Sequence, residues 1–237
     1  MANNTSVPKL PSKFTLYLRR FFYFLTNERF SKKFQYDWHK TPYRFDIINQ
    51  IIKIKKYNSY LEIGCQNDVN FSKILIGKKI GVDPYSGGTH RMTSDIFFEK
   101  NTQTFDLIFI DGLHLYEQVI KDVNNSLSVL NKNGIILLHD CLPSKIWHQT
   151  IPQTHVSWNG DVWKSIVEFR TMKNIDTFTI KADHGLGIIF KKKNTNTLNI
   201  KTKNFKKLKF EDYYNNHDEF MRIISEKEIF EIINNNN

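Results

Sequence analysis

The sequence has no long apolar run and only two cysteines. Both features restrict the classes of protein to which the chain can belong. No stretch of about 18 apolar residues occurs in its 237 residues, so we expect no transmembrane helix. The N-terminus lacks the charged, then apolar, then small-residue pattern of a secretory signal. Cys65 and Cys141 have no metal-ligand spacing and are expected to be free thiols. These features predict a cytoplasmic protein.

Acidic residues are missing from one part of the chain. Residues 191–209 contain eight lysines and no acid, and the formal net charge of the whole chain is +10. Such a balance raises the question of a nucleic-acid partner. Across the chain the lysines come with many Asn and Ile residues, so a biased base composition of the source genome could account for much of this charge. We therefore favour a solvated basic face, or attraction to an anionic substrate, over nucleic-acid binding.

The composition is otherwise that of a packed domain, with 40% hydrophobic and 14% aromatic residues. We divide the chain into an N-terminal arm with a basic and aromatic helix (1–42), a central domain (43–192), and a Lys/Asn-rich segment with a C-terminal amphipathic helix (193–237). Residues 14–34 carry aromatic and basic residues at helical spacing. That helix could dock by its aromatic face, cover a pocket, form a dimer interface or lie on a membrane surface.

Strands and helices alternate through the central domain. Apolar runs at 60–63, 79–83, 105–111 and 135–140 predict buried strands, and apolar spacing predicts helices at 43–55, 116–130 and 161–172. Continuous apolar strands between helices indicate a parallel sheet covered on both faces. The strands predicted at 175–181 and 186–190 are joined by a short turn, which indicates a hairpin at an antiparallel edge.

The turn after the first predicted strand favours a cationic ligand. Gly64 is followed by Gln66 and Asp68 where a dinucleotide-binding turn has further glycines, so a pyrophosphate would meet side chains. Glu62 stands just before that glycine, where its charge would repel a phosphate and attract a cation. Asp68 is expected to cap a short helix that carries Phe71 and Leu75.

Acids and histidines follow three other predicted strands. Asp83 lies about 20 residues after Gly64, where a carboxylate can bind ribose hydroxyls. Asp111 and His114 follow one strand, and His139 and Asp140 end the next. Because neighbouring parallel strands lie about 4.8 Å apart, these four side chains can converge on the ligand side of the sheet. We expect a catalytic or substrate-binding role for this group.

The ordered segments YLEIG, IGVDP, FDLIFIDGLHLYEQVIKD, GIILLHDCLP, GDVWK and HGLGII resemble a bacterial branch of the class I S-adenosylmethionine-dependent methyltransferases. The genes of this branch often accompany those for surface-sugar and natural-product assembly. The resemblance covers residues 60–190. It implies an α/β, Rossmann-like, doubly wound and mainly parallel seven-stranded sheet with an antiparallel C-terminal hairpin, S-adenosyl-L-methionine as cofactor, and a hydroxyl acceptor. The cofactor-binding residues that it implies are Glu62, Gly64, Cys65, Gln66, Asn67, Asp83, Pro84, Asp95, Ile96, Asp111 and Gly112.

A sugar hydroxyl is a poor acid, so its methylation requires a base. His139 or His114 could act as that base, with Asp111 or Asp140 orienting the imidazole, and we favour His139. The acceptor is expected to be a small molecule, a sugar or nucleotide-sugar, and its predicted binding residues are His114, Tyr116, Trp158, Asp161 and Trp163.

Two alternative enzymes and an open question accompany this prediction. Asp111 and Asp140 resemble two Mg²⁺ ligands of catechol-type O-methyltransferases, but Cys141 stands where the third ligand is usually Asn, and a thiol is a poor Mg²⁺ ligand. We therefore do not favour a divalent metal. An RNA methyltransferase would use the basic segment, but the chain lacks an Asn/Asp-Pro-Pro-Tyr/Phe motif for amine methylation. The sequence leaves a homodimer open.

Overall fold

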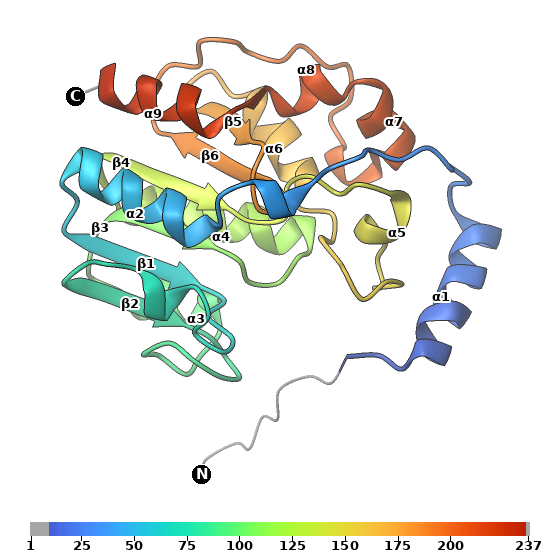
Figure 1. The fold of residues 1–237 in the computed structure, drawn as a ribbon, viewed down its shortest axis with the longest axis horizontal. Helices are drawn as coiled ribbons and strands as arrows, with labels where there is room; N and C mark the ends of the chain where they lie inside the picture. The colour runs from blue at the N-terminus through green and yellow to red at the C-terminus, as the bar shows by residue number, and fades with distance from the viewer. Residues whose placement is uncertain (1–9, 236–237) are drawn as a thin grey trace.

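A seven-stranded sheet forms the centre of the computed structural model, which describes residues 10–235 (Figure 1). In chain order the elements are α1 (Lys13–Thr26), η1 (Trp38–Lys40), α2 (Arg44–Lys55), β1 (Ser59–Ile63), η2 (Phe71–Lys73), β2 (Lys78–Val82), α3 (Ser94–Lys100), β3 (Phe105–Ile110), α4 (Tyr116–Val129), β4 (Leu130–Leu138), α5 (Ile146–Gln149), α6 (Trp163–Arg170), β5 (Asp176–Ile180), β6 (Leu186–Phe190), η3 (Phe205–Lys207), α7 (Phe210–Asn215), α8 (His217–Met221), β7 (Ile223–Ile224) and α9 (Glu226–Asn235).

The strand order creates a switch point at the middle of the sheet. The order is β2-β1-β3-β4-β6-β5-β7, and β2, β1, β3 and β4 are parallel to one another. The chain leaves β1 for β2 on one side and later returns to β3 on the other side. Ligands of open α/β sheets bind outside the carboxyl ends of the strands at such a reversal. The predicted sheet is confirmed, and its switch point lies between β1 and β3.

The predicted hairpin is also confirmed, because β6 runs antiparallel to both β4 and β5. The seventh strand comes from outside the predicted central domain. The short β7 pairs in parallel with β5 through Ile223 and Ile224. The C-terminal helix α9 packs beside α2 and buries Ile229 and Ile233. Residues 193–235 thus complete the sheet and its core, while the exact domain boundaries at 42 and 192 remain predictions.

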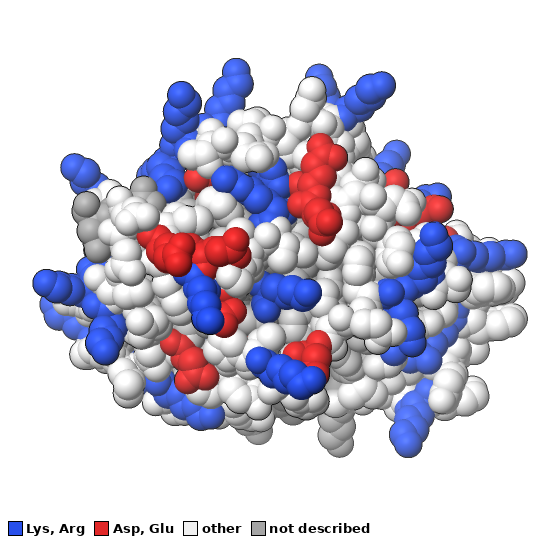
Figure 2. Space-filling view, turned by 45° about the horizontal axis from the view of Figure 1, so that its top comes forward, with Lys and Arg blue, Asp and Glu red and all other residues white. Residues whose placement is uncertain are grey.

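Positive charge is spread over the surface of the described residues. The lysines of the basic segment are exposed, apart from the partly buried Lys192. Figure 2 shows Lys and Arg side chains projecting around the rim of one face, with acidic groups closer to its middle. This distribution is that of a solvated basic surface.

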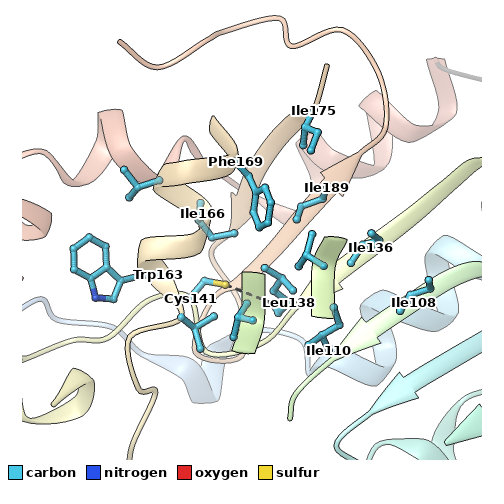
Figure 3. Packing of buried hydrophobic residues seen from close by; sticks show 14 of the residues in the cluster. Ile108, Ile110, Ile136, Leu138, Cys141, Trp163, Ile166, Phe169, Ile175 and Ile189 are labelled. Atoms are coloured by element: carbon cyan, nitrogen blue, oxygen red, sulfur yellow. Dashed lines mark hydrogen bonds between the residues drawn. The ribbon is translucent and has the colours of Figure 1, made fainter. Parts of the chain in front are cut away.

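Alternation along the strands builds two hydrophobic layers. Leu107 and Phe109 of β3 belong to the layer that includes α2 and α9. Ile108 and Ile110 of the same strand point to the opposite layer, under α4 and α6. Figure 3 shows this second layer, with Ile110 and Leu138 of the strands on the same side as Ile166 and Phe169 of α6. Both faces of the sheet are covered, as continuous apolar strands require.

The helix predicted directly after β1 does not form. Gln66 and Asp68 have left-handed backbone angles, with φ of 47° and 59°, and only the single 3-10 turn η2 follows. Leu75, which was expected on the buried face of that helix, is 77% exposed. The chain therefore offers individual backbone N–H groups of a turn at this edge, without the N-terminus of an α-helix.

The N-terminal helix is shorter than its aromatic and basic pattern suggested. It ends at Thr26, and the following residues run along the body without helical structure. Phe30 contacts Phe210 with ring centroids 5.8 Å apart, and Phe34 packs on Tyr214 at 4.7 Å. In Figure 1, α1 lies at the side toward which the β1 and β4 arrows point.

Gly64 is required where β1 and β3 approach one another. Its φ is +91°, and a Cβ at this position would lie 2.2 Å from the carbonyl oxygen of Asp111. Gly64→Ala should therefore lower the free energy of unfolding by at least about 2 kcal/mol, through backbone strain and a collision that neither strand can relieve. Urea titration followed by circular dichroism measures this change.

Gly77→Ala is the matched control, because no atom lies within 4 Å of a Cβ built there. This variant should change the free energy of unfolding by less than about 1 kcal/mol. Equal stabilities of the two variants would contradict the close approach of β1 and β3 at Gly64.

Candidate functional site

A cavity of about 680 Å³ opens at the carboxyl ends of the parallel strands. Its size is within the range of small-molecule sites. Among its lining residues are six acids, one arginine, two histidines and no lysine: Glu62, Asp83, Asp95, Asp111, Asp122, Asp140, Arg44, His114 and His139. The cavity is thus rich in carboxylates although the chain as a whole carries a net charge of +10.

Glu62 is one of the two most deeply buried of these acids, with 1% of its surface exposed. One of its carboxylate oxygens accepts hydrogen bonds from the Tyr60 hydroxyl at 2.5 Å and the Asn70 amide at 2.7 Å. Burial raises the pKa of Glu62 to about 7, although these two hydrogen bonds act to lower it. A cation in the cavity would favour the ionised form of this carboxyl group.

Asp83 ties the loops at the tips of β1 and β2 together. Its carboxylate accepts backbone N–H bonds from Gln66 at 2.9 Å, Tyr85 at 2.7 Å and Ser86 at 2.9 Å. Asp68 similarly accepts the N–H of Gly88 at 2.7 Å. The predicted ribose ligand Asp83 does line the cavity, and it also fixes the shape of the turn that begins at Gly64.

The acids and histidines that follow β3 and β4 meet as one cluster. The Nε2 atom of His114 lies 3.3 Å from Asp111, and its Nδ1 lies 3.4 Å from Asp140. The Nδ1 of His139 lies 3.2 Å from Asp111 and 3.4 Å from Asp140. His114 therefore contacts the two carboxylates through its two different ring nitrogens, whereas His139 contacts both of them through Nδ1 alone. The convergence that the strand ends predicted is present in the structure.

The charges in this cluster stabilise one another. Burial would lower the pKa of His139, but Asp111 and Asp140 outweigh that effect and raise it well above the ordinary value. The pKa of His114 is raised in the same way, against burial, by Asp111 and Asp140. Burial would raise the pKa of Asp111, yet the two imidazoles lower it well below its usual range. The cluster therefore favours ionised carboxylates.

Two further residues of the cluster were not identified from the sequence. Arg44, at the start of α2, lies 3.8 Å from Asp111 and 3.1 Å from the Nε2 of His139. Asp183, in the turn between β5 and β6, lies 3.2 Å from the Arg44 guanidinium and also accepts the Arg44 backbone N–H at 2.8 Å. The sequence could have indicated Asp183, because it lies in the turn of a predicted hairpin beside the end of β4. No sequence pattern pointed to Arg44.

Comparison with known proteins matches one segment of the chain to a described family. Residues 76–141, from just before β2 to the end of β4 and its cluster, match a family described as "Methyltransferase domain". This stretch is therefore similar to a methyltransferase domain. The match confirms the methyltransferase resemblance, while the surface-sugar branch stays a prediction. No curated protein sequence matches the chain.

Three solved structures are similar to the chain at low sequence identity. A methyltransferase of Podospora anserina bound to SAH is 16% identical and covers 78% of this chain and 99% of its own, with a TM-score of 0.49. An O-methyltransferase of Bacillus cereus in complex with SAH is 12% identical, with coverage of 78% and 92% and a TM-score of 0.48. The O-methyltransferase TomG of Streptomyces achromogenes, in complex with SAM, is 10% identical, with coverage of 63% and 79% and a TM-score of 0.48.

Most of the predicted cofactor residues line the cavity. The lining includes Glu62, Gly64, Cys65, Gln66, Asn67, Asp83, Pro84, Asp95, Asp111 and Gly112. The exception is Ile96, which is 41% exposed on α3 and is not among the lining residues. Its neighbour Asp95 pairs with Lys121 at 2.6 Å.

The predicted acceptor residues divide into two groups. His114 and Trp158 line the cavity and stack on one another, with ring centroids 5.5 Å apart. Trp163, by contrast, is wholly buried in the core, and Asp161 accepts the backbone N–H of Tyr116 at 2.7 Å. Tyr116, Asp161 and Trp163 are not among the residues that line the cavity, and a role for them in acceptor binding stays a prediction.

Three side chains at the ends of β3 and β4 could hold a metal ion. One ligand atom each of Asp111, His139 and Asp140 lies within 4.8 Å of the others. Two carboxylates and an imidazole suit several divalent cations. The buried Nδ1 of His139 faces both carboxylates but makes no hydrogen bond of good geometry. Cys141, at the position of the expected third ligand, is instead buried and directs its thiol toward the backbone carbonyls of Leu138 and His139.

The raised pKa of Glu62 predicts a pH-dependent cost to folding. The carboxyl group is protonated in both states below about pH 4.5, so it then costs nothing. Above about pH 7 it is ionised in both states, and burial of the charge lowers the free energy of unfolding by about 3 kcal/mol. Glu62→Gln keeps the oxygen that Tyr60 and Asn70 bind and removes the charge, so it should raise the melting temperature more at alkaline than at acidic pH.

Thermal unfolding of both proteins across this pH range measures the effect. The exposed Glu99→Gln serves as control, since its side chain stands in solvent and should alter stability little at any pH. A stability difference for Glu62→Gln that is independent of pH would contradict the assignment of the buried charge to Glu62.

Proposed function

We propose that this chain is an enzyme that uses S-adenosylmethionine to methylate a hydroxyl group of a small, sugar-linked acceptor. The observation that carries the proposal is the single cavity in which six carboxylates meet two histidines. The methyltransferase-domain match of residues 76–141 supports the reaction class. The aromatic face of Trp158 supports a sugar-linked acceptor, because such faces stack on sugar rings.

The charge of the cavity suits this cofactor. S-adenosylmethionine supplies an electrophilic methyl group on a sulfonium cation and carries no phosphate. Glu62 and Asp83 line the turn after β1 and the tip of β2, with Arg44 as the only Lys or Arg among the lining residues. A pyrophosphate or a nucleic-acid backbone would meet net negative charge there. The same lining therefore weighs against a dinucleotide and against RNA as the acceptor.

The surroundings of the two histidines bear on which of them removes the proton of the acceptor hydroxyl. The carbonyl oxygen of Trp158 lies 3.2 Å from the Nδ1 of His114 and accepts its N–H, so a proton from the acceptor would be taken up at Nε2, which lies 3.3 Å from Asp111 and would share that proton with its carboxylate. The His114 side chain is 19% exposed, against 6% for His139. Both ring nitrogens of His139 are enclosed, by two carboxylates on one side and by Arg44 and Asp183 on the other. We therefore place the base at His114 in preference to His139.

A metal-dependent O-methyltransferase is the second candidate, because Asp111, His139 and Asp140 form a set of donor groups. A divalent cation there would supply Lewis acidity that makes a hydroxyl easier to deprotonate. In that case His139 and the two carboxylates would hold the ion, Asn159 would orient Asp140 through its 2.6 Å hydrogen bond, and His114 would remain next to the acceptor. The role of His139 then differs between the two candidates.

Asp83→Ala should weaken S-adenosylmethionine binding about 10- to 100-fold, because it removes charge-assisted hydrogen bonds to ribose and loosens the turn at Gln66. Isothermal titration calorimetry measures the affinity. Asp37→Ala, a change of an acid that is half exposed and outside the cavity, should leave the affinity unaltered. Unchanged affinity of Asp83→Ala would refute the ribose contact.

Mass spectrometry of candidate nucleotide-sugars after incubation with the protein and S-adenosylmethionine tests the reaction itself. His114→Ala should slow methyl transfer by about 100-fold or more without a loss of cofactor affinity, since the base acts only on the acceptor. The exposed His39→Ala should retain full activity. Loss of activity in His139→Ala with a normal rate in His114→Ala would instead make His139 the base.

A chelator separates the two candidates in the same assay. Activity that persists in chelator excludes the metal-dependent enzyme. The metal-dependent enzyme is established if chelator abolishes activity and Mg²⁺ or Mn²⁺ restores it in the wild type but not in His139→Ala.

A further inference from the structure

Helix α1 exposes an unusual amount of apolar surface. Of its 14 residues only Leu16 is buried. Phe14 is 75% exposed, Tyr17 66% and Phe21 59%. The remaining large apolar residues of the helix that stand in solvent are Leu18, Phe22, Phe24 and Leu25.

These residues share one side of the helix. At about 100° per residue, positions 14, 17, 18, 21, 22, 24 and 25 form one continuous arc, and Leu16, Arg19 and Tyr23 lie opposite. The opposite side faces the protein. Arg19 donates to the carbonyl of Gln153 at 3.0 Å, and Arg20 donates to that of Thr154 at 2.8 Å. The helix is thus attached by its polar side and presents its apolar side outward.

The helix is too short to cross a bilayer. Fourteen residues span about 21 Å at 1.5 Å per residue, less than the roughly 30 Å of a hydrocarbon core. Within residues 10–235 no helix combines the length and hydropathy of a membrane span. An exposed apolar helix of this kind can lie in the plane of a membrane interface.

The charges around α1 indicate what kind of surface its exposed apolar side binds. Lys13 begins the helix, and Arg29, Lys32 and Lys33 follow it, all exposed. Glu28 is the sole acid between residues 13 and 33, and its carboxylate accepts hydrogen bonds from Tyr23, Gln149 and the Phe210 N–H. In a two-fold dimer the flanking cations of both copies would approach one another, whereas anionic headgroups would attract them.

We propose that the outward face of α1, formed by positions 14, 17, 18, 21, 22, 24 and 25, docks this chain on the surface of an anionic membrane. The apolar side chains enter the boundary between headgroups and acyl chains, and the flanking Lys and Arg side chains contact the headgroups. The proposal stands on α1 and its flanks and does not rest on the proposed enzymatic function.

Sedimentation of the full chain with lipid vesicles tests this proposal. The chain should bind vesicles of phosphatidylcholine mixed with phosphatidylglycerol, bind vesicles of phosphatidylcholine alone more weakly, and lose affinity as salt is raised. Phe21→Ser with Leu25→Ser should weaken binding to the anionic vesicles at least about 10-fold, because two exposed apolar groups of the docking face are lost. Lys32→Glu with Lys33→Glu should weaken it as well, with a smaller dependence on salt.

Leu75→Ser is the matched control, since Leu75 is 77% exposed but lies outside α1, and it should bind like the wild type. Circular dichroism confirms that each variant is folded, which is expected because every substituted side chain is exposed. Absence of binding to the anionic vesicles overturns the proposal. Equal vesicle binding by the α1 variants and the wild type would also overturn it. A third contrary outcome is a dimer, seen by light scattering, that Phe21→Ser with Leu25→Ser abolishes, together with no binding to vesicles.

Discussion

The concentration of carboxylates at the end of the sheet is the constraint on which the rest of the site depends. Carboxylates that line one cavity repel one another strongly when they are partly removed from water. The fold responds with the guanidinium of Arg44, with the imidazoles of His114 and His139, and with backbone N–H bonds to Asp83. Burial raises the pKa of Glu62, and the charge of Arg44 opposes only part of that rise. A cationic ligand or a metal ion would complete this compensation.

The sheet topology explains why the carboxylates meet. The carboxyl ends of β1, β2, β3 and β4 lie along one edge, and the reversal between β1 and β3 leaves a crevice there. Gly64 permits the backbones of these two strands to approach at that point. This part of the molecule could be predicted from the sequence, because each strand is a local apolar run that ends at a polar residue. The positions of Asp83, Asp111 and Asp140 follow from those runs alone.

The remainder depends on contacts between distant segments, which local patterns do not encode. Arg44 and Asp183 meet across the fold through the docking of α2 on the hairpin turn. The strand β7 is two residues long and has no pattern of its own, so its pairing with β5 arises only in the packed chain. Aromatic residues are ambiguous for a different reason: Trp158 and Trp163 are close in the sequence, yet one lines the cavity and the other is core.

The two proposals meet in the segment between α5 and α6. Arg19 and Arg20 of α1 bind the carbonyls of Gln153 and Thr154, and the same segment continues to Trp158 at the wall of the cavity. Figure 1 shows α1 on the side of the molecule toward which the β1 and β4 arrows point. A chain docked through α1 would therefore hold the carboxyl edge of its sheet near the lipid surface. An acceptor whose sugar is attached to a lipid would then reach the cavity by diffusion in two dimensions, with its polar part above the headgroups where Trp158 and His114 lie.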